Sequence, residues 1–142
     1  MTVQQSILID RPVAEVFAYL QNMDHRANYV PNLQSVELLT DGPLRLGSRF
    51  IETISVAGRT VPMTYEVVGF EENAWTQVET SDGPFPISAD LRLRPDGQKT
   101  HLAVVLDATL KGIFRLGAPM VKKAVEQQAA TMLKNIKHQL EE

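Results

Sequence analysis

Glu52 and Tyr65 are the two residues whose types and positions are best suited to chemistry. Glu52 falls in register with Phe50, Ile54 and Val56, which form the more apolar face of a predicted strand. If that face points inward, burial disfavours the charged carboxylate unless a partner compensates, and such a carboxyl group can serve as a general acid or base. The alternative is that a bulge or an edge position turns Glu52 towards solvent. The sequence leaves both readings open.

Tyr65 lies on the following predicted strand, where it alternates in the same direction as Met63 and Val67. Its ring can fill apolar space while its hydroxyl donates a hydrogen bond to an oxygen of a ligand. A tyrosine that only packs in the core is the alternative interpretation. Glu52 and Tyr65 are therefore the candidate catalytic residues, but no third group nearby in the sequence defines a reaction.

Other kinds of chemistry find little support in the sequence. The chain has no cysteine, which excludes disulfides, thiolate nucleophiles and cysteine-based metal sites. His25, His101 and His138 lack the spacing of a zinc motif, and we predict that each lies at the surface. Neither a nucleophile elbow nor a glycine-rich phosphate loop is present. We therefore expect no metal and no cofactor.

The size and composition are those of an ordinary globular chain. With 142 residues, 44% hydrophobic and 22% charged, it is predicted to form a single domain over residues 1–142. A net charge of −3 argues against a nucleic-acid partner, which usually requires a basic face. The N-terminus lacks the pattern of a signal peptide, and no apolar run reaches the ~20 residues of a membrane span. We expect a soluble, cytoplasmic protein without an integral membrane segment.

The first third of the chain predicts a strand followed by two short helices. Residues 3–9 read as the strand; Asp10 is then suited to cap a helix that has Pro12 just inside its start. Residues 22–31 predict a second short helix, opened by Asp24 and ended before Pro31.

Six further strands follow, separated by short turns, so that neighbouring strands should be antiparallel. The clearest alternation runs from Ile87 to Arg94. A sheet with one apolar face must bury it against another element. The only element long enough to cover it is the C-terminal run.

That run, Pro119 to Glu142, predicts one long amphipathic helix with Pro119 at its first position. Its apolar residues recur at spacings of three and four and should form one wall of the interior: Val121, Val125, Gln128, Ala129, Met132, Ile136 and Leu140. Leu116 and Met120 fall off this stripe, so they could line an entrance, contact a partner or pack as an ordinary satellite. The predicted fold class is α+β, a seven-stranded antiparallel curved sheet wrapped around a long C-terminal helix, with two short helices after strand one.

This order of elements and several local motifs resemble the SRPBCC superfamily of START-like and birch-pollen-allergen-like helix-grip proteins, and within it the polyketide cyclase/dehydrase group. The matching stretches are Ile7 to Phe17 (ILIDRPVAEVF), Asn28 to Pro31 (NYVP), Gly47 to Phe50 (GSRF), Tyr65 to Val68 (YEVV), and the C-terminal helix with Leu133 and Ile136. The resemblance covers essentially the whole chain. It implies that a hydrophobic or amphipathic small molecule binds between sheet and helix.

Three functions remain open at this point. The first is binding of a lipid, polyketide or aromatic ligand; the second is a polyketide cyclase/dehydrase-like enzyme that uses Glu52 and Tyr65; the third is an interaction module or homodimer. Phe85 and Phe114, in the loops at one end of the predicted cavity, could form a lid. The predicted ligand-binding residues are Tyr29, Phe50, Glu52, Met63, Tyr65, Phe85, Ala89, Leu91, Phe114, Val121, Val125, Gln128 and Met132.

Overall fold

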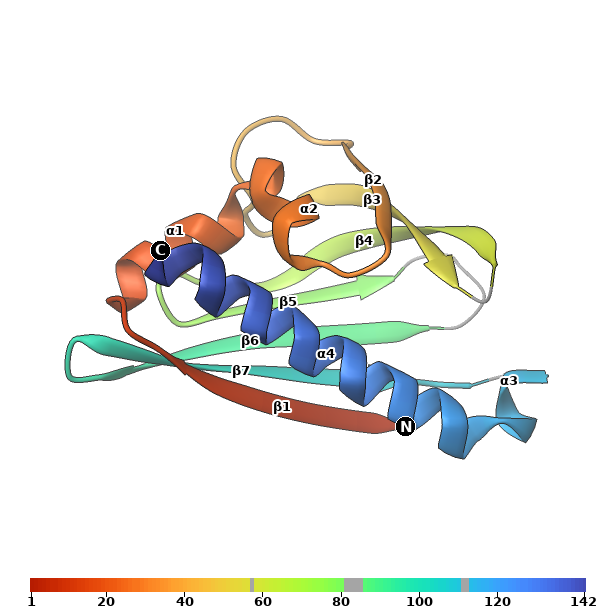
Figure 1. Cartoon of the computed structure of the whole chain (residues 1–142). Helices are drawn as coiled ribbons and strands as arrows, with labels where there is room; N and C mark the ends of the chain where they lie inside the picture. The colour runs from red at the N-terminus through yellow and green to blue at the C-terminus, as the bar shows by residue number, and fades with distance from the viewer. Residues whose placement is uncertain (57, 81–85, 111–112) are drawn as a thin grey trace.

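A computed structural model describes residues 1–56, 58–80, 86–110 and 113–142, without the side chains of residues 56, 113 and 114. It consists of one antiparallel sheet with a long helix across one face (Figure 1). The elements in chain order are β1 (Thr2–Ile9), α1 (Val13–Gln21), the 3₁₀ helix η1 (Met23–His25), α2 (Arg26–Tyr29), β2 (Leu33–Leu38), β3 (Arg49–Val56), β4 (Arg59–Glu71), β5 (Trp75–Thr80), β6 (Ile87–Asp96), β7 (Lys99–Ala108), α3 (Ile113–Leu116) and α4 (Ala118–Glu141).

The seven strands are ordered β1-β7-β6-β5-β4-β3-β2, and every neighbouring pair is antiparallel. This confirms the predicted α+β architecture. The register pairs Phe50 with Tyr65 and Glu52 with Met63. Because directly opposed residues point to the same face of a sheet, these four side chains share the face that α2 and α4 cover.

The long strand β4 bends at a bulge, where the pairing with β5 shifts between Val67 and Gly69. Gly69 is required there, because a Cβ would lie 2.4 Å from the ring of Trp75. Beyond the bulge Phe70 meets Phe17 of α1 edge to face, with ring centroids 5.5 Å apart. The bend therefore directs the end of the sheet towards α1.

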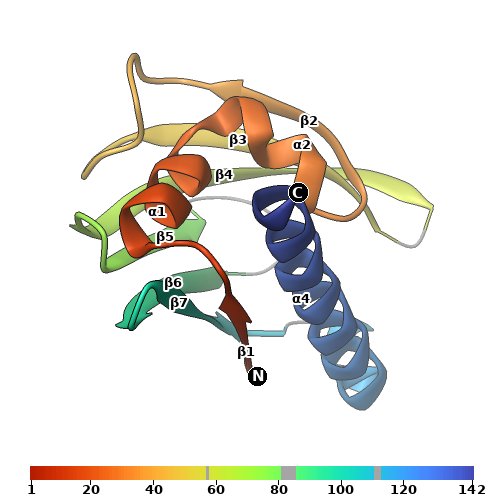
Figure 2. The same ribbon diagram turned by 60° about the vertical axis from the view of Figure 1, so that its left-hand side comes forward.

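Helix α4 bridges the two edges of the curved sheet. Its backbone lies closest to edge strand β1 and to α2, and α2 leans on the other edge strand, β2. Figure 2 shows the helix on one side of the sheet, with α2 above it. The prediction that this helix covers the sheet is confirmed.

The two halves of α4 pack differently. In what we call the closed end, the C-terminal half joins α1 and the ends of β1, β6 and β7 in one buried cluster, which includes Ile9, Val16, Phe17, Leu20, Leu93, Leu102, Ala129, Leu133, Ile136 and Leu140. The same cluster extends to Val3 of β1, Val104 of β7 and Tyr29 of α2, and the half-buried Leu91, Val125 and Met132 pack against it. In what we call the open end, the residues of α4 are only half-buried, and so are the inward-facing residues of β6, namely Val121, Val125, Gln128, Ile87, Ala89 and Leu91.

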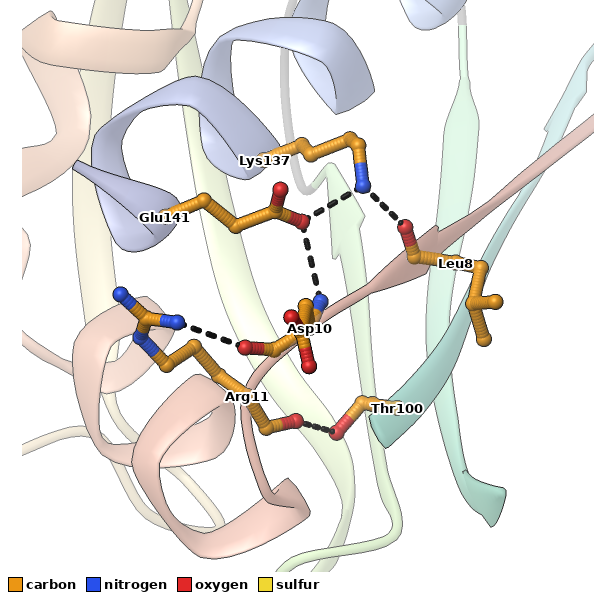
Figure 3. Close-up of polar contacts among 6 residues, drawn as sticks. All are labelled: Leu8, Asp10, Arg11, Thr100, Lys137 and Glu141. Carbon is orange, nitrogen blue, oxygen red and sulfur yellow. Dashed lines mark hydrogen bonds and ion pairs between the residues drawn. The ribbon is translucent and has the colours of Figure 1, made fainter. Parts of the chain in front are cut away.

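A chain of polar contacts fastens the closed end (Figure 3). Lys137 Nζ donates to the Leu8 carbonyl oxygen at 2.8 Å and pairs with Glu141 Oε2 at 2.5 Å. The same Glu141 oxygen accepts the Asp10 N–H at 2.9 Å. These contacts join the last turn of α4 to the end of β1 and to the segment that leads into α1.

Some predicted boundaries were wrong, for local reasons. Asp10 does not cap α1: Pro12 occupies the N-cap position in an extended conformation, so the helix starts at Val13, too far from Asp10. The second short helix is opened by Asn22, whose side chain accepts the Asp24 N–H at 3.0 Å, and not by Asp24. Helix α4 begins at Ala118, one residue before the predicted Pro119.

Candidate functional site

Four residues form a polar cluster on the inner face, and we call Arg26, Tyr29, Glu52 and Tyr65 the inner polar cluster. Glu52 is only 4% exposed, so its strand turns it inward and not to solvent. Arg26, from the first turn of α2, donates its Nε–H to Glu52 Oε2. Its Nη1 also lies 3.4 Å from the Tyr29 hydroxyl oxygen. Short helix α2 therefore supplies the cation that the carboxylate on β3 requires.

Aromatic rings surround this ion pair. The Phe50 and Tyr65 rings stack with their centroids 5.4 Å apart. The guanidinium carbon of Arg26 lies 5.4 Å from the Phe50 centroid and 5.8 Å from the Tyr29 centroid. A guanidinium near the faces of aromatic rings is attracted by their quadrupoles. These contacts, together with the carboxylate, offset the cost of removing two charges from water.

The electrostatics keep both hydrogen-bond donors protonated. Burial acts to lower the pKa of Arg26, but the negative charge of Glu52 opposes it, and the net shift is upward. Burial raises the pKa of Tyr65, the Glu52 carboxylate adds to this, and Arg26 acts in the opposite direction. The cluster therefore presents a permanent cation and a neutral phenol, and its carboxylate is already paired with the cation.

The arrangement favours recognition of oxygen atoms over proton abstraction. Arg26 has donors beyond the one that Glu52 uses, and Tyr65 carries an O–H that makes no hydrogen bond within the described part of the chain. A carbonyl, phenol or carboxylate oxygen of a ligand is the group that such donors fit. The acid–base role proposed for Glu52 from the sequence stays a prediction. The structure shows that the carboxylate of Glu52 has a salt-bridge partner, Arg26.

The predicted ligand residues fall into three sets. Tyr29, Phe50 and Met63 are fully buried around the cluster. Residues on β6 and α4 line the open end and stay partly accessible although they face the interior: Ala89, Leu91, Val121, Val125, Gln128 and Met132. Phe85 and the side chain of Phe114 lie outside the described residues, and so does the lid that they were predicted to form.

A hollow of about 640 Å³ opens at the free end of α4. Its lining includes Ala108 and Leu110 after β7, Arg115 of α3, and Pro119 and Lys122 of α4. None of the predicted ligand residues belongs to this lining. The hollow and the inner polar cluster are therefore separate features of the molecule.

Arg26 is the site residue that sequence reasoning missed. The available signal was indirect: a glutamate on an apolar strand face needs a buried cation, and arginine is best suited to that pairing. The chain separation of 26 residues hid the partner. His25, predicted to be at the surface, is instead half-buried and stacks on Tyr19 with ring centroids 4.2 Å apart.

Two features are absent from the described residues, a metal site and a membrane-crossing helix. No group of three or more histidine, cysteine, aspartate or glutamate side chains is placed to hold a metal ion there. In the same part of the chain, no helix combines the length and the apolar character that a membrane crossing requires.

Solved structures with the same fold are numerous, although their sequences are distant. A protein from Thermus thermophilus has a TM-score of 0.85 and 19% identity, over 97% of this chain and 95% of that one. The Zhui aromatase/cyclase from a Streptomyces species has a TM-score of 0.84 and 17% identity, over 99% and 93% of the two chains. A START superfamily protein from Mycobacterium smegmatis has a TM-score of 0.84 and 18% identity, over 99% and 97%.

No curated protein matches the sequence. The profile of one family matches residues 1–141; that family is described as polyketide cyclase / dehydrase and lipid transport. Its match and the shared helix-grip fold confirm the resemblance drawn from the local motifs. The chain therefore belongs to the family described as polyketide cyclase / dehydrase and lipid transport.

Proposed function

We propose that the protein binds an amphipathic small molecule between the sheet and α4, with an oxygen of the ligand at the inner polar cluster. The observation that carries this proposal is the position of Arg26 and Tyr65, two donors among mostly apolar residues of the inner face. Binding sites for small molecules are typically apolar with a few placed polar groups.

The apolar part of the ligand would lie along the open end. There Ala89 on β6 and Val121 and Val125 on α4 face the interior and still keep accessible surface. Apolar surface that folding leaves accessible is what a ligand can cover with a gain of roughly 25 cal/mol per Å². A flat or elongated molecule with one oxygen-bearing end fits this distribution of polar and apolar surface.

The test is displacement of a fluorescent apolar dye, anilinonaphthalene sulfonate, by a fatty acid, a flavonoid and a steroid, with native mass spectrometry of the complexes. We expect one class to displace the dye. Tyr65→Phe should weaken that ligand about fivefold, the value of one net hydrogen bond. Tyr19→Phe is the matched control and should bind normally, because it keeps the ring that stacks on His25 and lies 5.9 Å from the Tyr29 ring and removes only a hydroxyl that does not belong to the cluster.

The proposal fails if no class displaces the dye, or if Tyr65→Phe and Tyr19→Phe change the affinity equally. The first result would mean that side chains fill the open end. The second would mean that the ligand oxygen lies away from Tyr65.

A polyketide cyclase or dehydrase activity is the second candidate, favoured by the same two donors. Arg26 and Tyr65 are both held protonated, and both could stabilise negative charge that develops on a carbonyl oxygen. The matching measurement is loss of water from a poly-keto substrate followed by mass spectrometry. Because cyclisation alone keeps the mass, the products are also separated by chromatography; binding without loss of water and without a new isomer would leave the protein as a carrier. The cytoplasmic location, the single-domain organisation and the homodimer stay predictions.

A further inference from the structure

The free end of α4 exposes two large apolar side chains. Leu116, the last residue of α3, is 88% exposed, and Met120 in the first turn of α4 is 80% exposed. The next most exposed large apolar residue of the described chain, Leu46, reaches 65% in the loop before β3. Exposed apolar residues gathered at one place mark contact sites more often than scattered ones do. We call Arg115, Leu116, Met120, Lys122 and Lys123 the helix tip.

Basic residues outnumber acidic ones around the helix tip, although Asp107 lines the neighbouring hollow and Glu126 follows one turn after Lys122 in α4. Between Thr109 and Val125 the sequence contains four of the chain's 14 lysines and arginines and no aspartate or glutamate. Of these four, Arg115, Lys122 and Lys123 are exposed in the structure. The whole chain nevertheless carries a net charge of −3. This excess of positive charge complements an anionic surface.

Apolar and basic residues together fit one kind of partner. Insertion of a few apolar side chains gives only weak attachment to a bilayer, and attraction of lysine and arginine to anionic lipids adds about 1 kcal/mol for each charge. The hollow of about 640 Å³ beside Arg115 and Lys122 offers space at the same end. Contact between the helix tips of two copies of the chain would bring like charges together and is therefore disfavoured.

We propose that the helix tip docks on the surface of an anionic lipid bilayer, with Leu116 and Met120 in the interface and Arg115, Lys122 and Lys123 against the headgroups. The attachment is peripheral and reversible. It places the free end of α4, and with it the open end of the interior, next to the membrane (Figure 1). This proposal and the proposed ligand binding are tested separately, because vesicle binding is measured without an added ligand.

The experiment is co-sedimentation with vesicles of phosphatidylcholine alone and with vesicles of equal parts phosphatidylcholine and phosphatidylglycerol. We expect binding to the mixed vesicles only, and loss of that binding at high salt. Lys122→Gln with Lys123→Gln should weaken it about 30-fold, since two charges are removed. Leu116→Ser with Met120→Ser should weaken it about tenfold or more.

Matched controls change exposed residues of the same types away from the helix tip. Leu46→Ser changes an exposed leucine in another loop, and Lys134→Gln changes an exposed lysine further along the same helix. Both should bind within about twofold of the unmodified protein, because neither reaches the interface. All of these variants alter surface residues, and urea unfolding followed through the single tryptophan verifies that each is folded.

Three results would overturn the proposal. The first is no sedimentation with mixed vesicles. The second is an equal loss of binding in the tip variants and the controls. The third is a dimer in light scattering that Leu116→Ser with Met120→Ser dissolves while vesicles bind no protein, which would assign the tip to a second copy.

Discussion

At the closed end, Leu133, Ile136 and Leu140 of α4 are buried in one cluster with α1, whereas Val121 and Val125 of the same helix are half-buried at the open end. Strand β6 shows the same gradient, since Leu93 is buried while Ala89 stays accessible. Strands β1 and β7 do not, because Val3 and Ala108 are buried at the open end too. We therefore expect the closed end to contribute most of the stability, and the proposed ligand to lie at the open end. The amphipathic stripe of the helix is continuous in sequence, so the division comes from what faces it.

The largest effect should come from the inner polar cluster. Glu52→Gln leaves the Arg26 guanidinium buried without a carboxylate, which costs about 3–5 kcal/mol of unfolding free energy. Urea unfolding measures it. Replacing both residues at once, Arg26→Met with Glu52→Leu, should recover most of the loss because no buried charge remains. A Glu52→Gln variant as stable as the parent would show that the pair is open to solvent.

Truncation tests the two halves of α4 directly. Leu133→Ala at the closed end should lower the free energy of unfolding by about 2–5 kcal/mol, because the buried cluster cannot close the cavity. Val121→Ala at the open end removes a side chain that is already partly in water, so we expect less than about 1 kcal/mol. Equal losses in the two variants would abolish the distinction between the ends.

Enlargement gives the complementary pair. Ala129→Leu overpacks the closed end and should cost about 1–3 kcal/mol, while leaving dye uptake per folded molecule unchanged. Ala89→Leu adds the same atoms at the open end, where we expect little loss of stability but weaker binding of anilinonaphthalene sulfonate. If Ala129→Leu instead blocks the dye and keeps full stability, the available space lies at the other end.

The smallest effect concerns pH. The hydrogen bond from the Asp10 N–H, followed by that from Lys137, lowers the pKa of Glu141 below its ordinary value. A carboxylate with a lowered pKa stabilises the fold above its unfolded pKa, and this contribution disappears as the pH falls through the lowered value. Thermal unfolding should therefore show a small acid-side loss that Glu141→Gln lacks. An identical pH profile for the two proteins would argue against the contacts of Glu141 with Asp10 and Lys137 at the closed end.

The sequence predicted most of the fold, because alternation and turn residues are local signals. The strand from Ile87 to Arg94 and the helix ending at residue 141 were recognised from the residues themselves. Asp10 was misread as a cap, because Pro12 in an extended conformation takes the N-cap position. The choice between two helix starts rested on the ψ angle of Pro12, 155°, because the proline ring fixes φ but leaves ψ free.

The site was only half predictable for a related reason. Period two placed Glu52 and Tyr65 on the same face, and the register confirms it. Nothing in the pattern of α2 marks Arg26 as an inward cation, because an arginine in a short helix is usually exposed. The periodicity of α4 also predicted one continuous apolar stripe, with no difference in packing along the helix. Which part of it is packed depends on α1 and on the bend in β4, and these are tertiary features.

The clamp formed by Leu8, Asp10, Lys137 and Glu141 has a mechanical consequence. It fixes α4 at one end, while the other end carries exposed Leu116 and Met120 and lacks comparable packing. A helix fixed at one end can tilt about that end. About 19 residues separate the clamp from the first turn, a length of about 29 Å, so a rotation of about 10° displaces that turn by about 5 Å. A tilt of this size would widen the open end while the contacts of the clamp stay in place.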